Sequence, residues 1–342
     1  MRSENFEQGP IRPPGEADSL LIRITRGCPW NRCAFCTLYK GLEFSIRPVS
    51  EIIKDIAAAR KCYGDAPIEK CFLQDGDSFA METGDLVEVL RDLKQAFPSL
   101  KQISSYGRAQ SLTRKSLEEM KEIGDAGLNM LYCGMESGSQ KVLKKVRKGL
   151  TVRSIIDSSN KAKDAGMEIL LFAILGLGGK ELTQSHADET AALINRIDPA
   201  EIRILSLAIK PGTVLDAMVK EGAFTPLSEL EMVEEQQRIL GQLSGISSQY
   251  GNYHGVNLLT ELQGQLPQDK ARLLATTQQF LSLSRQEQNN FIFGRRNGYY
   301  TQLKDMQQTA RHALVQAELE RCEKITSGQL ETYFHDCRRR WI

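Results

Sequence analysis

The chain has 342 residues, of which 41% are hydrophobic, so it can bury a sizeable core in about two domains. Its 44 basic and 43 acidic side chains leave a formal net charge of +1, which gives no electrostatic reason to expect a nucleic acid or an anionic membrane as partner. No run approaches the ~18 apolar residues of a membrane span, and the polar N-terminus lacks the apolar stretch of a secretory signal. We therefore expect a cytoplasmic protein with no membrane partner, whose eight cysteines stay reduced.

Strand-like and helix-like stretches alternate along the first 215 residues. The expected strands are residues 20–26, 70–74, 101–106, 128–134, 168–175 and 201–208. The expected helices are one from Val49 onward and residues 86–97, 116–123, 151–165 and 181–196. This alternation predicts an α/β fold with a parallel sheet, and about six βα units suit a partial (β/α)6 TIM-like barrel or a doubly wound sheet. In both architectures the active residues gather where strands end and loops begin.

The pattern changes between about residues 215 and 225, where strand signals end and Gln and Leu become frequent. Helices are expected at residues 227–243, 269–283 and 300–322. The sequence therefore predicts an N-terminal extension (1–19), a core partial barrel (20–215) and a C-terminal helical region (216–342). We expect the polar, Gln-rich helices of the last region to form a lid or a packing layer rather than a catalytic module.

Three cysteines lie within nine residues, directly after the first expected strand, in the segment Cys28-Pro-Trp-Asn-Arg-Cys33-Ala-Phe-Cys36. Three thiolates this close can hold three irons of a [4Fe–4S] cubane and leave the fourth iron open to another ligand. A structural zinc site would need a fourth ligand, and the nearest histidine along the chain is His186. Zinc and unrelated buried cysteines stay open as alternatives, but the spacing favours the cluster.

The cysteine segment resembles the cluster loop of radical S-adenosylmethionine enzymes, whose usual spacing has three residues in the first gap and two in the second. Here the gaps are four and two residues, which resembles some branches of that superfamily. The resemblance implies a [4Fe–4S] cluster on Cys28, Cys33 and Cys36, S-adenosylmethionine as cofactor, and an electron donor such as flavodoxin or ferredoxin. Phe35 matches the aromatic residue that lies beside the adenine in the family.

Two further segments resemble the family at matching positions. Gln74-Asp75-Gly76-Asp77 follows the second strand, where the family binds the methionine amino group, which implies this role for Gly76 and Asp77. The fourth strand ends in Gly134-Met135-Glu136-Ser137-Gly138, which resembles the Gly-x-Glu-Ser motif of the branch with oxygen-independent coproporphyrinogen oxidases and the Elongator catalytic subunit. Lys148-Gly149-Leu150-Thr151 continues this likeness, which implies that Glu136 and Ser137 contact the cofactor.

Gly176 and Gly178 end the fifth strand, where the family runs its backbone past the adenine, so the resemblance covers about residues 20–215. Each of these matches has a structural alternative. Asp75 and Asp77 would also suit a turn, Glu136 would suit a helix start, and the glycines at 176–179 would suit a simple βα turn. The glycines form neither a dinucleotide fingerprint nor a phosphate loop, because Glu181 occupies a position that both motifs need.

Candidates for substrate contact are fewer. Arg108 and Arg203 could clamp a carboxylate, although a solvated or ion-paired arginine is more common, and His254 lies in a loop where a surface position is the simpler interpretation. The resemblance implies a radical enzyme that takes hydrogen from a small or medium-sized molecule. Two alternatives stay open, an RNA-modifying relative and a non-catalytic iron–sulfur carrier or assembly protein. A nucleic-acid partner is not expected, because the net charge is near zero and no nucleic-acid module is visible.

Overall fold

The computed structural model describes residues 6–327 and 329–340. The chain divides into two compact units, each built from two stretches of sequence. The first unit contains the chain up to Met135 and then Lys148–Leu171, and the second contains Glu136–Arg147 and the chain from Phe172 onward. The division therefore falls at the end of one strand and in the middle of another, so each unit is described separately.

The first unit is built on parallel strands. These are β1 (Leu20–Arg23), β4 (Lys70–Gln74), β5 (Gln102–Tyr106), β6 (Leu128–Glu136) and the first half of β7 (Glu168–Leu175), in that order across the sheet. Leu20 pairs with Cys71, and Cys71 pairs with Ile103. Four successive residues of β4 are buried, as expected of a parallel strand covered on both faces. The short strands β2 (Thr25–Arg26) and β3 (Ser45–Ile46) form a separate antiparallel ribbon.

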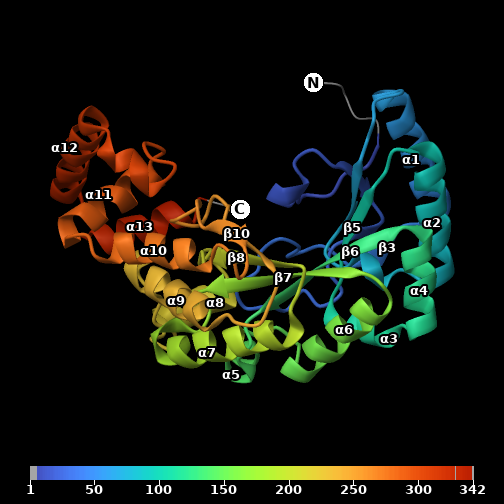
Figure 1. Cartoon of the computed structure of the whole chain (residues 1–342), viewed down its shortest axis with the longest axis horizontal. Helices are drawn as coiled ribbons and strands as arrows, with labels where there is room; N and C mark the ends of the chain where they lie inside the picture. Colours follow the sequence, from blue (N-terminus) through green and yellow to red (C-terminus); the bar gives the residue numbers. More distant parts are fainter. Residues whose placement is uncertain (1–5, 328, 341–342) are drawn as a thin grey trace. The chain divides into compact units, whose positions relative to one another are not determined.

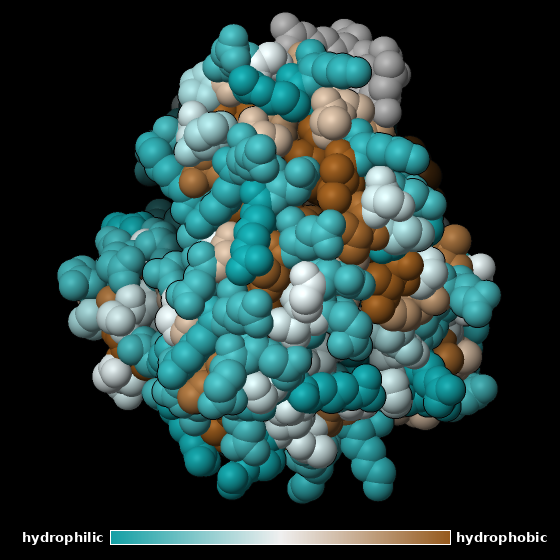
Figure 2. Space-filling view, turned by 90° about the vertical axis from the view of Figure 1, so that its right-hand side faces the viewer, coloured by the Kyte–Doolittle hydropathy of each residue, from teal (hydrophilic) through white to brown (hydrophobic). Residues whose placement is uncertain are grey.

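The helices of the first unit follow its strands in sequence. They are α1 (Val49–Tyr63), α2 (Thr83–Ala96), α3 (Ala109–Arg114), α4 (Leu117–Ala126) and α6 (Val152–Asp164), with short 3₁₀ turns η1 (Pro14–Glu16) and η2 (Ser78–Ala80). Helix α2 packs between α1 and α4, and the three lie side by side in Figure 1. Seen from their side, the surface is largely hydrophilic, with hydrophobic residues scattered among polar ones (Figure 2). Ser116 and Glu119 form a capping box at the start of α4.

The second unit combines the end of β7 with short strands and many helices. Its other strands are β8 (Glu201–Ser206), β9 (Gln249–Gly251) and β10 (Gln263–Gln265); β9 runs parallel to β8, and β10 runs antiparallel to β9. Its helices are α5 (Gln140–Lys145), α7 (Gly179–Ile197), α8 (Val214–Lys220), α9 (Glu229–Gln242), α10 (Lys270–Leu281), α11 (Arg285–Arg296), η3 (Leu303–Gln307), α12 (Thr309–Ile325) and α13 (Leu330–Arg338). Helix α9 packs against both α7 and α10, and α11 packs against α12 and α13.

All six strands expected in the first 215 residues are present, which confirms the α/β class with a mostly parallel sheet. Two expectations for the rest of the chain are wrong. Strands do occur after residue 216, as β9 and β10, and the helix expected over residues 300–322 is interrupted before α12. The 3₁₀ turn η3 precedes α12 instead, and Asp305 Oδ2 accepts hydrogen bonds from the backbone N–H groups of Thr301 and Gln302 at its start. Over the described residues, no helix is both long enough and apolar enough to cross a membrane.

A buried ion-pair cluster stabilises the helices of the second unit. Arg296 donates two hydrogen bonds to Glu229, at 2.7 Å from Nε to Oε1 and 2.7 Å from Nη2 to Oε2, and Arg338 Nη1 lies 3.3 Å from Oε1. The three side chains are 1–3% exposed. Burial opposes the ionisation of Glu229, but the two guanidinium groups outweigh it and hold the pKa of this carboxyl below its ordinary value.

We predict that Glu229→Gln destabilises the protein by about 3–5 kcal/mol, because two buried guanidinium groups lose their counter-charge. Urea unfolding measures this loss. Glu234→Gln is the matched control, since Glu234 is exposed on the same helix, and it should change the free energy of unfolding by no more than about 0.5 kcal/mol. Equal effects of the two substitutions would contradict the prediction.

Candidate functional site

The three predicted ligand cysteines lie on the loop between β2 and β3. None of the three forms a disulfide; Cys33 is buried, and Cys28 and Cys36 are partly buried. Burial raises the pKa of the Cys36 thiol, and the neighbouring Cys33 and Cys28 act in the same direction, so the three groups lie within electrostatic reach of one another. Within the described residues, no three His, Cys, Asp or Glu side chains are already grouped around a metal position. The loop nonetheless carries the three-thiol donor set that suits a [4Fe–4S] cluster.

Asp75, directly after β4, anchors this loop on both sides of the cysteines. Its Oδ2 accepts a hydrogen bond from Arg23 Nη2 at 2.6 Å and a longer one from the Gly27 N–H at 3.4 Å. Its Oδ1 accepts from the Tyr39 hydroxyl at 3.1 Å. Burial raises the pKa of Tyr39, so the phenol keeps the proton that it donates. Because Gly27 precedes the first cysteine and Tyr39 follows the third, Asp75 fixes the loop to the end of β4.

Two glycines allow other segments to approach the loop closely. A Cβ atom on Gly76 would lie 2.8 Å from the Tyr39 ring and 3.1 Å from the Cys28 Cβ. Gly149 has a φ of +71°, and a Cβ atom there would collide with the Trp30 ring. Only glycine tolerates both the conformation and the contact. The structure thus places Gly76 and Gly149 against the cysteine loop, while the predicted contact of Gly76 with S-adenosylmethionine stays a prediction.

The Asp77 carboxylate is fully buried and already has partners within the protein. Its Oδ1 accepts from the Arg108 N–H at 3.1 Å, and its Oδ2 accepts from the Ser111 hydroxyl at 2.6 Å. Burial raises the pKa of Asp77 to about 6, and the two hydrogen bonds oppose this shift only in part. Asp77 therefore attaches the start of α3 to the end of β4, and its role toward S-adenosylmethionine stays a prediction.

In the second unit, Glu136 ends β6 in an unusual backbone conformation. Its φ is +63°, the left-handed region that non-glycine residues seldom occupy, and its side chain is 8% exposed. The next two residues are bound to α7: Ser137 Oγ lies 2.8 Å from His186 Nδ1, and the Gly138 N–H donates to Thr190 Oγ1 at 2.8 Å. The end of β6 is thus held in place by side chains of a helix about 50 residues further along the chain.

The predicted glycines after β7 form the turn into α7. Gly176 has a φ of +77°, and its N–H donates to Glu235 Oε2 at 2.6 Å. Gly178 is the residue before the first turn of α7, and a Cβ atom there would lie 3.0 Å from the Leu182 backbone. These contacts agree with the βα-turn interpretation, and a role of Gly176 and Gly178 beside a cofactor stays a prediction. Phe35, in the first unit, is partly buried next to Cys36.

The candidate substrate contacts have partners within the protein. Arg203 is buried, pairs with Glu201 Oε1 at 2.6 Å, and lies over the Tyr253 ring at 4.8 Å from its centre. His254 is partly buried rather than at the surface, and its Nδ1 accepts a hydrogen bond from the backbone N–H of Val256 in its own turn. Arg108 donates to the Lys148 carbonyl at 3.4 Å. Arg203 thus follows the ion-paired interpretation that the sequence left open.

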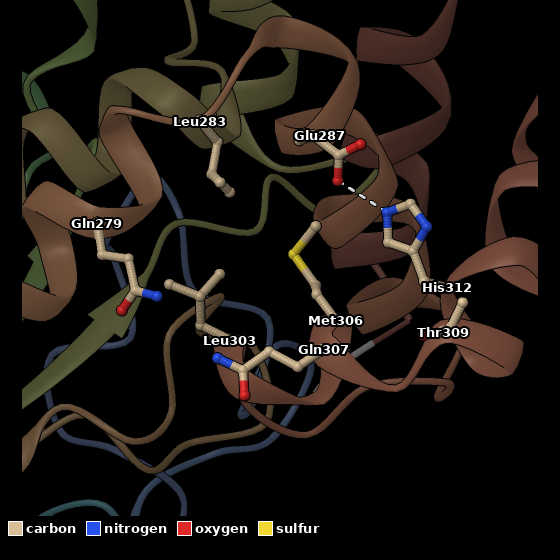
Figure 3. A pocket seen from close by; sticks show the side chains of 8 residues that line it. All are labelled: Gln279, Leu283, Glu287, Leu303, Met306, Gln307, Thr309 and His312. Atoms are coloured by element: carbon tan, nitrogen blue, oxygen red, sulfur yellow. Dashed lines mark hydrogen bonds and ion pairs between the residues drawn. The ribbon is translucent and has the colours of Figure 1, made fainter.

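A pocket of about 380 Å³ lies among the helices of the second unit (Figure 3). Gln279, Leu283, Glu287, Leu303, Met306, Gln307, Thr309 and His312 line it. His312 Nε2 lies 2.7 Å from Glu287 Oε2, and the pair is drawn at one wall of the pocket in Figure 3. No residue predicted to bind the cluster or S-adenosylmethionine lines this pocket, so it is assigned no part in their binding.

The sequence pattern does not identify three of the residues that hold the site. It indicates only a turn for Asp75, and it gives no role to His186 or Glu235. The available signal was a polar side chain at a core position: His186 and Thr190 fall in the apolar stripe of α7, and Glu235 falls in that of α9. Buried polar groups need partners, so such positions point to long-range hydrogen bonds without identifying the partner.

The radical SAM superfamily matches residues 22–194, just over half of the chain, and the protein therefore belongs to this superfamily. Its members are enzymes that use a [4Fe–4S] cluster and S-adenosylmethionine, and these are the cofactors of this chain.

Individual relatives are more distant. An uncharacterized methyltransferase of Pyrococcus horikoshii is 27% identical over 197 residues, which cover 57% of this chain and 40% of that protein. A tRNA-2-methylthio-N(6)-dimethylallyladenosine synthase of Petrotoga mobilis is 25% identical over 264 residues, which cover 70% of this chain and 59% of that protein. The chain thus spans less than two thirds of the length of both relatives. Methylornithine synthase (PylB) has a similar fold, with a TM-score of 0.50 at 16% identity over 76% of this chain and 68% of that one.

We predict that Asp77 makes the protein less stable as the pH rises. Its folded pKa of about 6 exceeds its ordinary value of 3.8, so the folded state binds this proton more tightly than the unfolded state. The stability due to this group is present below about pH 4 and is lost as the pH rises to about 6, with a change of about 1–3 kcal/mol. Urea unfolding of the wild type and Asp77→Asn across this range should show the loss only in the wild type.

Asp65→Asn is the control for this series, because the Asp65 side chain is 99% exposed. It should keep the pH dependence of the wild type. An Asp77→Asn variant with the wild-type dependence would show that another group is responsible.

We predict that Glu136→Gly is more stable than Glu136→Ala by about 0.5–1 kcal/mol, because both lose the carboxylate but only glycine adopts a φ of +63° without strain. The same pair at Glu122, which is exposed in the right-handed helix α4, should rank in the opposite order, with glycine worse by about 1 kcal/mol. Thermal and urea unfolding of the four variants give both differences. The same order at both positions would show that residue 136 is not strained.

Proposed function

We propose that Cys28, Cys33 and Cys36 hold three irons of the [4Fe–4S] cluster of this enzyme, with the fourth iron open to S-adenosylmethionine. The observation that carries this proposal is a single loop with three cysteines, none of them in a disulfide, fixed at both sides by Asp75. When bound, the cluster and S-adenosylmethionine supply a 5′-deoxyadenosyl radical that takes a hydrogen atom from the substrate. The protein positions these groups and excludes water from them.

We assign separate roles to residues of this chain in fixing the cysteine loop and in binding the cofactors. In the first unit, Asp75 and Gly76 fix and accommodate the cysteine loop, and we propose that Phe35 and Asp77 complete the cofactor-binding residues there. In the second unit we propose Glu136, Ser137, Gly176 and Gly178. Glu136 would accept hydrogen bonds from the ammonium or the ribose hydroxyls of S-adenosylmethionine, because a carboxylate forms strong hydrogen bonds with cationic donors.

We propose a small or medium-sized molecule as the substrate, since the near-zero net charge supplies no broad attraction for a polyanion. RNA modification is the second candidate, and one observation favours it: the Petrotoga mobilis relative is named a tRNA-modifying synthase. The expectation that nucleic acid is not a partner therefore has no support from the relatives. Binding of tRNA that weakens steeply with rising salt would favour RNA, and turnover of free metabolites with deuterium transfer into 5′-deoxyadenosine would favour a small molecule.

We predict that Cys33→Ala abolishes the iron–sulfur absorbance of the anaerobically reconstituted protein and its release of 5′-deoxyadenosine, because two thiolates cannot hold the cluster in place of three. Iron and sulfide content per chain, the visible spectrum and chromatography of the nucleoside measure this. Cys62→Ala is the matched control, since Cys62 lies on α1 outside the loop and forms no disulfide, and it should keep both properties. Zinc without iron in the anaerobically purified wild type would refute the proposed function.

A further inference from the structure

A chain of hydrogen bonds runs from the end of β6 through His186 to the end of β7. The Ser139 N–H donates to Ser137 Oγ at 3.0 Å, Ser137 Oγ lies 2.8 Å from His186 Nδ1, and His186 Nε2 lies 3.0 Å from the Ile174 carbonyl oxygen. A carbonyl oxygen only accepts, so His186 carries its proton on Nε2. Nδ1 then accepts a hydrogen bond from the Ser137 hydroxyl, so the donor and the acceptor of each of these hydrogen bonds are defined.

Glu235, on helix α9, extends this series of hydrogen bonds. Its Oε2 accepts from the Gly176 N–H at 2.6 Å and lies 3.8 Å from His186 Nε2, while its Oε1 accepts from the Thr183 hydroxyl at 2.6 Å. The side chains of His186 and Glu235 are both 0% exposed. Hydrogen bonds sealed from water in this way are costly to break, because the groups left behind have no solvent to replace a lost partner.

The network lies directly beside the strained backbone of Glu136. A non-glycine residue keeps a left-handed conformation only when its surroundings over-determine it. The residues that follow Glu136 supply this restraint: Ser137 is bonded to His186, and Gly138 is bonded to Thr190 and packs so closely on α7 that an added Cβ atom would collide with the Glu189 carbonyl.

We propose that His186, supported by Glu235, is a positioning residue that holds Ser137 and thereby keeps Glu136 in the left-handed conformation that presents its carboxylate to S-adenosylmethionine. This inference rests on the proposed role of Glu136 in binding S-adenosylmethionine. In this role His186 acts through its hydrogen bond with Ser137 on the neighbouring Glu136. A histidine that only satisfied the core would stabilise α7 without any coupling to Glu136.

The first test uses the protein without cluster or S-adenosylmethionine. His186→Phe keeps a ring of similar size but removes both nitrogens, so hydrogen–deuterium exchange at the Gly138 and Ser139 amides should become at least about 10-fold faster. Ile194→Ala is the control, since Ile194 is buried on α7 and makes no bond in the network. It should destabilise α7 without selective acceleration at these two amides. Unchanged exchange in His186→Phe would overturn the proposal.

The second test is a double-mutant cycle on S-adenosylmethionine binding to the anaerobically reconstituted enzyme. His186→Phe should weaken binding about 10-fold in the wild type, with unchanged iron content, and should cause no further loss in a Glu136→Ala background. His186→Asn keeps an acceptor near the Nδ1 position and should restore binding to within about 3-fold of the wild type. This rescue separates the bond to Ser137 from simple filling of the core.

The outcomes distinguish this inference from the proposed function. Equal losses from His186→Phe in both backgrounds, or full affinity in His186→Phe, would overturn the positioning role while the enzyme still binds its cofactors. Full affinity in Glu136→Ala would do the same, because there would be no carboxylate contact to position. A wild-type chain that holds the cluster but binds no S-adenosylmethionine would instead refute the proposed function, and the positioning role with it.

Discussion

In both units, polar groups are buried at the carboxyl ends of the parallel strands. These groups need hydrogen-bond or ionic partners, and this requirement determines how the neighbouring segments are attached. A buried charge or amide without a partner costs several kcal/mol, so each strand end recruits a specific side chain from elsewhere in the sequence. Asp75, after β4, accepts hydrogen bonds from Arg23 and Tyr39. The N–H of Gly176, after β7, donates to Glu235. These pairs place the cysteine loop in the first unit, and they tie α9 to the strand ends in the second. The same edge that parallel sheets use for chemistry is therefore also where their helices are fixed.

Two aspartates separated by one glycine show how neighbours decide the properties of chemically identical groups. Asp75 faces the guanidinium of Arg23 at 2.6 Å, whereas Asp77 has only a hydroxyl and a backbone N–H as partners. Burial raises the pKa of Asp77, and its hydrogen bonds from Ser111 and the Arg108 N–H oppose this shift only in part. Asp75 is thereby suited to anchor a loop through charge, and Asp77 to join two elements whether or not it is ionised.

Local patterns in the sequence are sufficient to predict most strands and the cysteine loop, because both depend on residues that are close together along the chain. The period of apolar residues predicts the six expected strands up to β8 but misses the two-residue strand β3, and the cysteine spacing predicts the loop. The partners of the strand ends could not be predicted, because Ser137 and His186 are 49 residues apart and Gly176 and Glu235 are 59 apart. The strands β9 and β10 have three residues each, too few for an alternating pattern to be visible.

The contacts of Glu235 connect the C-terminal part of the chain with the region that the superfamily match covers. The superfamily match ends at residue 194, yet Glu235 reaches back to Gly176 and Thr183 and lies beside His186. A helix outside the matched region thus supplies a buried charge to the strand ends inside it. Losing α9 would leave the buried Gly176 N–H and the Thr183 hydroxyl without their acceptor, so α9 belongs physically to the core that it covers. Variation beyond residue 194 can therefore alter the geometry at the ends of β6 and β7 without changing any residue of the motifs themselves.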